Sequence, residues 1–186
     1  AACPDRPFAA MTSDHHTVYA NTKALELAGL LHGKEVDEGS EVVMGADGMA
    51  TGELLEAGAS GPILACTPLG GRELLGLTSG ANPVPAASTA ERTTDKDVIA
   101  KGLQHCASHG ITSLHNMDGN FYQLELLSEL EQDGRLLCRT EVPMHLKHTD
   151  PIDRLSEAVE MRAQYGGDNV WCGRVKMFMD GVIDSR

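Results

Sequence analysis

The second half of the chain alternates between helical and strand-like hydrophobic patterns. Apolar residues recur at helical spacing over 95–109, where Thr94 and Asp97 form the pattern of a capping box. Residues 111–115 are a short β-rich run, and residues 121–130 return to helical spacing. Further elements follow in order: a strand over 136–146, a helix from Asp150 to Gly166, and a strand over 173–180.

Strands separated by helices in this way run parallel, because a parallel return needs a crossover of a dozen or more residues. The pattern therefore predicts an α/β fold. Three strands alone cannot bury both faces of a parallel sheet, so we expect them to belong to a larger sheet or barrel.

The first half follows another pattern. Residues 17–31 carry a helical period, and residues 41–52 predict a β-hairpin around an Asp-Gly turn. Residues 70–88 are rich in Gly, Pro, Ser and Ala, which predicts a long loop. We expect two parts: residues 1–90, with a strand, a helix, the hairpin and the loop, and residues 91–186, with the βα units.

Composition excludes several classes of partner. The 186 residues carry a net charge of -12, and Lys and Arg do not cluster, so the chain lacks the electrostatic footprint of a nucleic-acid or anionic-membrane binder. No apolar stretch approaches the roughly 18 residues of a spanning helix, and the start does not resemble a signal peptide. We expect a soluble, cytoplasmic protein. Both ends read as if cut from a longer chain.

The five cysteines are widely spaced and contain no C-x-x-C pair. This spacing fits neither a disulfide framework nor a zinc ribbon. We expect all five to be reduced.

Strand parity over 136–146 separates two faces, because alternate side chains point to opposite sides. Polar positions share one parity (Arg139, Glu141, His145) and apolar positions the other (Leu136, Cys138, Val142, Met144). A polar face on a parallel strand indicates a barrel lumen with a site at its mouth. The alternative is an edge strand whose polar face meets solvent.

Lys176 lies in the middle of the last predicted strand, on the same parity as Asp180. A lysine in such a position either pairs with a carboxylate or loses its proton. A neutral amine can take up carbon dioxide to form a carbamate that ligates a metal. The strand pattern alone favours an ion pair with Asp180 or Glu141.

Most of the eight histidines do not predict a metal site. His105 and His109 have the spacing of a zincin pair without its glutamate, so we interpret them as helix-end residues. His145 and His148 lie at the end of a predicted strand, where they could belong either to an active site or to a solvated loop.

His15 and His16 follow Asp14 at the junction between a strand and a helix. The group could form a polar site. It could equally be a helix N-cap provided by Ser13 or Asp14, and spacing does not decide between the two.

Four segments together resemble the family 3 amidohydrolases, the metal-dependent hydrolases related to N-substituted formamide deformylase and to the exoenzyme-regulatory-protein group. In chain order they are Asp14–Leu30, Asp47–Leu54, Gly110–His115 and Val175–Gly181. Each segment alone would be a weak signal. Their order and their coverage of most of the chain make the resemblance specific.

This resemblance implies a partial (β/α)8 metal-hydrolase barrel of about three βα units, with the N-terminal helix and hairpin as an insertion. It implies hydrolysis of amide or other C–N bonds by water activated on a divalent metal, with zinc expected. The lysine of the K-x-F-x-D-G strand carries over to Lys176 as a carboxylated metal ligand, which reverses the ion-pair interpretation. His16, His115 and Asp180 carry over as substrate-binding residues.

The family's H-x-H would precede Ala1, and its later histidines and general-base aspartate would follow Arg186. The resemblance therefore assigns no catalytic residue here, and we expect a central fragment that does not complete a metal site alone. The alternative is a non-catalytic α/β interaction or scaffold module.

The expected ligand is a small-molecule substrate, and we expect neither nucleic acid nor membrane as a partner. We also expect a homo-oligomer, because unpaired strand edges and an uncovered apolar face favour association. That face would comprise Leu136, Cys138, Val142, Met144, Val175, Met177 and Met179.

Overall fold

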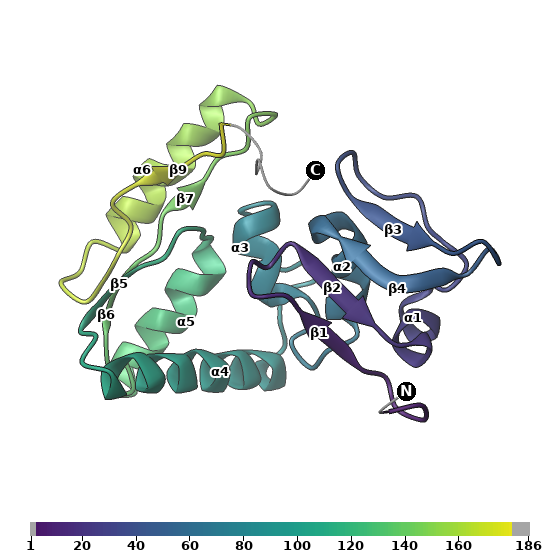
Figure 1. The fold of residues 1–186 in the computed structure, drawn as a ribbon. Coiled ribbons are helices and arrows are strands. Elements are labelled where there is room, and N and C mark those ends of the chain that lie inside the picture. The colour runs from purple at the N-terminus through teal and green to yellow at the C-terminus, as the bar shows by residue number, and fades with distance from the viewer. Residues whose placement is uncertain (1–2, 180–186) are drawn as a thin grey trace. The chain divides into compact units, whose positions relative to one another are not determined.

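The computed structural model describes residues 3–179. They divide into two compact units, the first ending at Arg72 and the second beginning at Glu73, and each unit is described by itself (Figure 1).

The first unit is a four-stranded antiparallel sheet with two helices. Its strands are β1 (Ala9–Met11), β2 (Thr17–Ala20), β3 (Glu41–Met44) and β4 (Ala50–Leu55), in the order β1-β2-β4-β3, and its helices are α1 (Thr22–Ala28) and α2 (Glu56–Ala65). Val18, Leu25, Leu54 and Ile63 are buried together in its core. The predicted hairpin is confirmed as β3 and β4, with Gly48 at φ 78° in its turn.

The helix predicted over 17–31 is wrong at its start. Residues 17–20 form β2, because this β-branched and aromatic run pairs with β1 on one side and β4 on the other. The side chain of Asn21 then accepts a hydrogen bond from the Ala24 backbone N–H at 3.0 Å and begins α1. Gly29, at φ 69°, ends the helix.

The second unit alternates helices and strands, as the hydrophobic pattern predicts. After η1 (Arg72–Leu74) and α3 (Leu75–Thr78) come α4 (Thr89–Ser108), β5 (Ser113–His115), α5 (Phe121–Gln132), β6 (Arg139–Glu141), β7 (Met144–His145), η2 (Ile152–Arg154), α6 (Leu155–Gln164), β8 (Val170–Trp171) and β9 (Val175–Lys176). All pairings between these strands are parallel, in the order β5-β6-β8 and separately β7-β9. The α/β class is confirmed.

Several boundaries differ from the prediction. The loop expected over 70–88 contains η1 and α3. α4 starts six residues early, because Ser88 and Glu91 make the capping box instead of Thr94 and Asp97.

The strands are shorter than predicted as well. The strand over 136–146 is split by Pro143, which has no N–H to donate to a sheet. The strand over 173–180 is limited to Val175–Lys176 within the described residues, and β8 precedes it.

The apolar face that we expected to be uncovered is largely buried. Cys138, Val142 and Met144 are each at most 2% exposed, in a core with side chains from α4, α5 and α6. Val175 and Met177 are exposed, as expected. The error arises because the three helices are sufficient to cover the β6–β7 part of that face.

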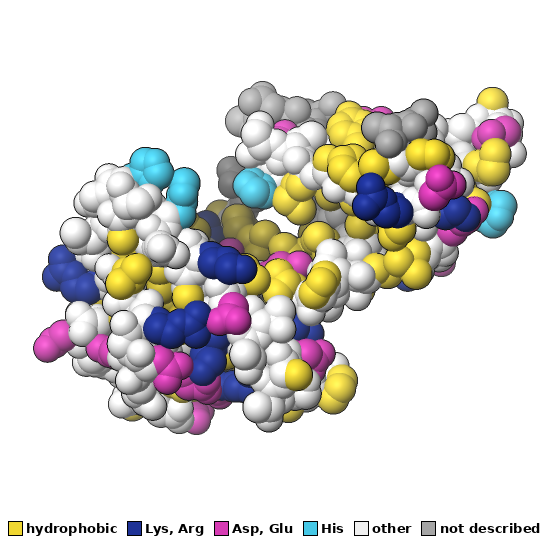
Figure 2. Space-filling view, turned by 90° about the horizontal axis from the view of Figure 1, so that it is seen from below, with side chains coloured by type: hydrophobic (Ala, Val, Ile, Leu, Met, Phe, Trp, Pro, Cys, Tyr) yellow, Lys and Arg dark blue, Asp and Glu magenta, His cyan; other side chains and the backbone are white. Residues whose placement is uncertain are grey.

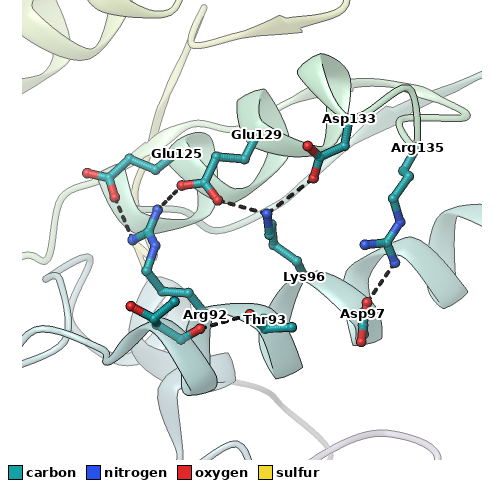
Figure 3. A network of polar contacts seen from close by, with 9 residues as sticks. Arg92, Thr93, Lys96, Asp97, Glu125, Glu129, Asp133 and Arg135 are labelled. Atoms are coloured by element: carbon teal, nitrogen blue, oxygen red, sulfur yellow. Dashed lines mark hydrogen bonds and ion pairs between the residues drawn. The ribbon is translucent and has the colours of Figure 1, made fainter.

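A ladder of ion pairs joins α4 to α5 (Figure 3). Arg92 contacts Glu125 and Glu129, and Lys96 contacts Glu129 at 3.1 Å and Asp133 at 3.2 Å. Arg92 also lowers the pKa of the Glu129 carboxyl group through a hydrogen bond. Side chains spaced by four residues on both helices produce this arrangement. Figure 2 likewise shows Lys and Arg side chains lying among Asp and Glu side chains, not gathered in one basic patch.

Candidate functional site

The parallel strands of the second unit share a polar face. Strand register places His115 beside Glu141 and Glu141 beside Trp171, and it places His145 beside Lys176. Glu141 and His145 are each 2% exposed, and β6 lies between β5 and β8. The alternative of a solvated edge strand is therefore wrong.

One group of side chains lies at the carboxyl ends of β5, β7 and β9. We call Asp118, His145, Lys176 and Phe178 the carboxyl-end cluster. The His145 Nδ1 atom is 2.8 Å from the carbonyl oxygen of Gly76, and the His145 ring lies 5.5 Å from the Phe178 ring. The Lys176 Nζ atom is 4.1 Å from the centre of the Phe178 ring.

Asp118 is the acid of this cluster. Burial raises the pKa of its carboxyl group, against the opposing effects of a hydrogen bond with Gln123 and of the charges on His145 and Lys176. Gly76 packs directly against it, since a Cβ there would lie 2.9 Å from the Asp118 Oδ1 atom. Sequence analysis missed Asp118, although a carboxylate just after a parallel strand was a usable signal.

The Lys176 side chain lies over the Phe178 ring and near Asp118. The face of an aromatic ring attracts a cation, and the Asp118 carboxylate acts on Lys176 as an opposite charge. The ion pair expected with Glu141 is wrong, because Glu141 contacts His115 and Arg174 instead. Asp180 lies outside the described residues.

We call His115, Glu141 and Arg174 the buried-glutamate cluster. The Glu141 Oε2 atom is 2.8 Å from the Nδ1 atom of His115 and 2.6 Å from the Nε atom of Arg174. The Glu141 side chain is 3% exposed, whereas that of His115 is 60% exposed. Sequence reasoning missed Arg174, which lies in the irregular connection between β8 and β9.

In the first unit, His16 faces Glu56. The His16 Nδ1 atom is 3.0 Å from both carboxylate oxygens of Glu56, and this hydrogen bond raises the pKa of His16. Glu56 itself has φ 64° and His15 has φ 65°, a left-handed conformation that is uncommon outside glycine.

A helix N-cap by Ser13 or Asp14 is wrong, because the strand β2 follows them. Asp14 instead accepts hydrogen bonds within the β1–β2 turn, from the Thr12 hydroxyl and from the His16 N–H. The Thr12 hydroxyl is the main cause of the lowered pKa of Asp14.

Three further histidines lie outside these groups. His105 and His109 lie at the end of α4 with their rings 4.5 Å apart, and His148 is an exposed loop residue. All five cysteines are free.

Within residues 3–179, no group of three or more His, Cys, Asp or Glu side chains could hold a metal ion. Across the same residues, no helix is both long and apolar enough to cross a membrane. The carboxyl-end cluster therefore offers Lys176 with His145 and Asp118, which is not a complete ligand set.

Comparisons with known proteins show the family of the chain. YtcJ of Bacillus subtilis (strain 168), which carries the name of an amidohydrolase, is 24% identical over 188 residues, covering 98% of this chain and 30% of YtcJ. The structure of an uncharacterized metal-dependent hydrolase from Pyrococcus horikoshii OT3 has a similar fold, with a TM-score of 0.54 at 19% identity, over 98% of this chain and 30% of that one. The chain thus spans about 30% of the length of both relatives. The profile of the amidohydrolase family matches residues 1–186, and the chain belongs to that family.

Proposed function

We propose that this chain is part of a metal-dependent amidohydrolase that hydrolyses amide-type C–N bonds of a small molecule, with Lys176 as one metal ligand. The observation that carries the proposal is the position of Lys176, beside His145 at the carboxyl end of a parallel strand on the polar face. Active sites of (β/α)8 enzymes form at the carboxyl ends of the strands. The family match supports the same reading.

Lys176 fits a metal only after its charge changes. Its amine must lose a proton, and its nitrogen then forms a bond to carbon dioxide while a second proton leaves to solvent, which gives a carbamate anion. The side chain must also leave the Phe178 ring, which favours the cation. A divalent metal, which we take to be zinc, would polarise the scissile carbonyl group and lower the pKa of water.

The other residues of the carboxyl-end cluster have roles that follow from their contacts. The Gly76 carbonyl oxygen accepts a hydrogen bond from the Nδ1–H tautomer of His145, which fixes the ring and leaves its Nε2 atom as the acceptor. Asp118 places a carboxylate next to Lys176. His16, His115 and Asp180 are proposed to bind the substrate.

Metal analysis of the complete protein tests this function. We expect Lys176→Ala to lose metal and amide hydrolysis together, and we expect metal uptake by the unaltered protein to depend on bicarbonate. Lys147→Ala, at an exposed lysine, is the matched control and should change neither. Unchanged metal content and activity in Lys176→Ala would reject the assignment.

A zinc titration of the 186-residue chain separates this proposal from a module with its own metal. We expect no stoichiometric binding, because one lysine and a few dispersed ligands cannot complete a tetrahedral site. Stoichiometric binding would show that the chain holds a metal independently of other segments.

We also propose that the chain self-associates and that the protein is cytoplasmic, without a nucleic-acid or membrane partner. Exposed Val175, Met177 and Phe178 lie on or next to the edge strand β9, and the free thiols fit a reducing compartment. Light scattering across a dilution series tests the association. A monomer at every concentration would contradict it.

A further inference from the structure

The buried-glutamate cluster has a charge arrangement that no metal ligand explains. Glu141 is a carboxylate with a 3% exposed side chain, and a single oxygen of it, Oε2, meets both His115 and Arg174. Gly173 lets the backbone approach closely, since a Cβ there would lie 2.9 Å from the Glu141 Oε1 atom. A buried charge needs such compensation. Glu141 therefore holds a histidine and an arginine side by side.

Both contacts with Glu141 are short ion pairs, and they leave N–H donors of Arg174 available. Among the described residues, Oε2 has no aligned hydrogen-bond donor, although both nitrogen atoms are within 2.8 Å. Among the described residues, the Arg174 side chain donates one hydrogen bond, from Nη2 to the Asn116 carbonyl oxygen at 3.1 Å. A guanidinium group carries five N–H donors in a fork that matches a carboxylate. Most of the Arg174 fork thus stays available, and its side chain is 39% exposed.

The surroundings also favour an anion. The chain has 27 acidic residues against 15 Lys and Arg, yet residues 139–141 and 170–174 contain two arginines, Arg139 and Arg174, against the single acid Glu141. Beside them the rings of Trp171 and His115 form a T-shaped pair with their centroids 6.5 Å apart, and Trp171 supplies an apolar wall for the rest of a ligand.

We propose that His115 and Arg174, held in place by Glu141, bind the carboxylate group of a small-molecule ligand. Arg174 presents its remaining N–H donors to the two carboxylate oxygens, and the exposed edge of His115 adds a third contact. If the ligand is the substrate, this inference rests on the proposed function and restricts the substrate to C–N compounds that carry a carboxylate. Binding of the carboxylate itself requires neither metal nor activity.

Nuclear magnetic resonance of the 186-residue chain tests the site, with sodium acetate as the probe and sodium chloride at matched ionic strength as the reference. We expect acetate to shift the His115 ring signals in a saturable way and chloride to leave them unchanged. In Arg174→Lys, which keeps the charge that balances Glu141 but removes the fork, we expect at least tenfold weaker binding. Arg139→Lys, on the same face, should bind acetate like the unaltered chain.

Three results would overturn the proposal: equal shifts with chloride, unaltered affinity in Arg174→Lys, or saturable binding of inorganic phosphate without binding of acetate. Arg174→Lys must retain the dispersed amide spectrum of the unaltered chain for its result to count. Should it unfold, His115→Gln takes its place, with the Arg174 side-chain signals as the readout and the same tenfold loss expected. These results are independent of the metal analysis of Lys176.

Discussion

The two units each contain a histidine paired with a glutamate, and the two pairs differ in burial. His16 and Glu56 have side chains that are 31% and 33% exposed, so solvent screens both charges. His115 is 60% exposed, but its partner Glu141 is 3% exposed and depends on Arg174 as well. A screened pair contributes little to stability, whereas a buried carboxylate makes its partners indispensable. Similar distances therefore predict very different consequences of mutation.

The largest effect is expected at Arg174. Arg174→Ala leaves the buried Glu141 carboxylate with His115 as its single described ion-pair partner, and we expect it to lower the free energy of unfolding by about 2–3 kcal/mol. Urea denaturation measures this loss.

The matched control is His16→Ala in the exposed pair, with an expected loss below about 1 kcal/mol. The double variant Arg174→Ala/Glu141→Gln should recover part of the stability, since it removes the uncompensated charge. Equal losses in Arg174→Ala and His16→Ala would show that burial does not distinguish the two pairs.

A second effect concerns the backbone of Glu56. Glu56→Ala and Glu56→Gly both remove the partner of His16, but only glycine relieves the left-handed φ of 64°. Relief of this strain stabilises the folded state by about 1–2 kcal/mol. The greater flexibility of glycine in the unfolded state lowers the free energy of unfolding by about 0.5–1 kcal/mol. We expect Glu56→Gly to be more stable than Glu56→Ala by about 0.5–1 kcal/mol in thermal or urea unfolding. If alanine is equal or better, the strain at this position is absent.

The smallest effect is the pH dependence of the exposed pair. The Glu56 carboxylate raises the pKa of His16 in the folded state above its ordinary value near 6.5. The pair therefore stabilises the fold fully below about pH 6.5, and this contribution is lost as pH rises through the raised pKa. Resonance titration of His16 should show its pKa falling toward 6.5 in Glu56→Gln. An unchanged pKa would mean that the hydrogen bond does not form in solution.

Local periodicity was sufficient for much of the fold. The helix predicted over 121–130 is α5 (Phe121–Gln132), and the alternation of helices and strands gave the parallel pairing. The pattern failed where a distant partner decides the structure, as at residues 17–20, which become a strand through pairing with β1 and β4. It failed again at Pro143, where one missing N–H divides a strand.

The candidate site was predictable to the same degree. Strand parity separated Glu141 and His145 from Cys138, Val142 and Met144, and only these last three belong to the hydrophobic core. Parity could not identify Arg174, because that residue lies in an irregular segment between two strands and reaches Glu141 through tertiary structure. The roles given to Lys176 and His16 came from the family resemblance and stay predictions.

The connection at residues 172–174 has a consequence for insertions and deletions. Trp171 and Lys176 are five residues apart, an odd number, yet each pairs with a residue outside the hydrophobic core, Glu141 and His145 respectively. Strict alternation would put Trp171 and Lys176 on opposite faces, so the connection shifts the phase of the strand by one residue. We expect the addition or removal of one residue there to turn Lys176 toward the helix-covered core. Chain length at residues 172–174 is thus constrained, whereas we expect the surface loop at residues 83–87 to accept length changes.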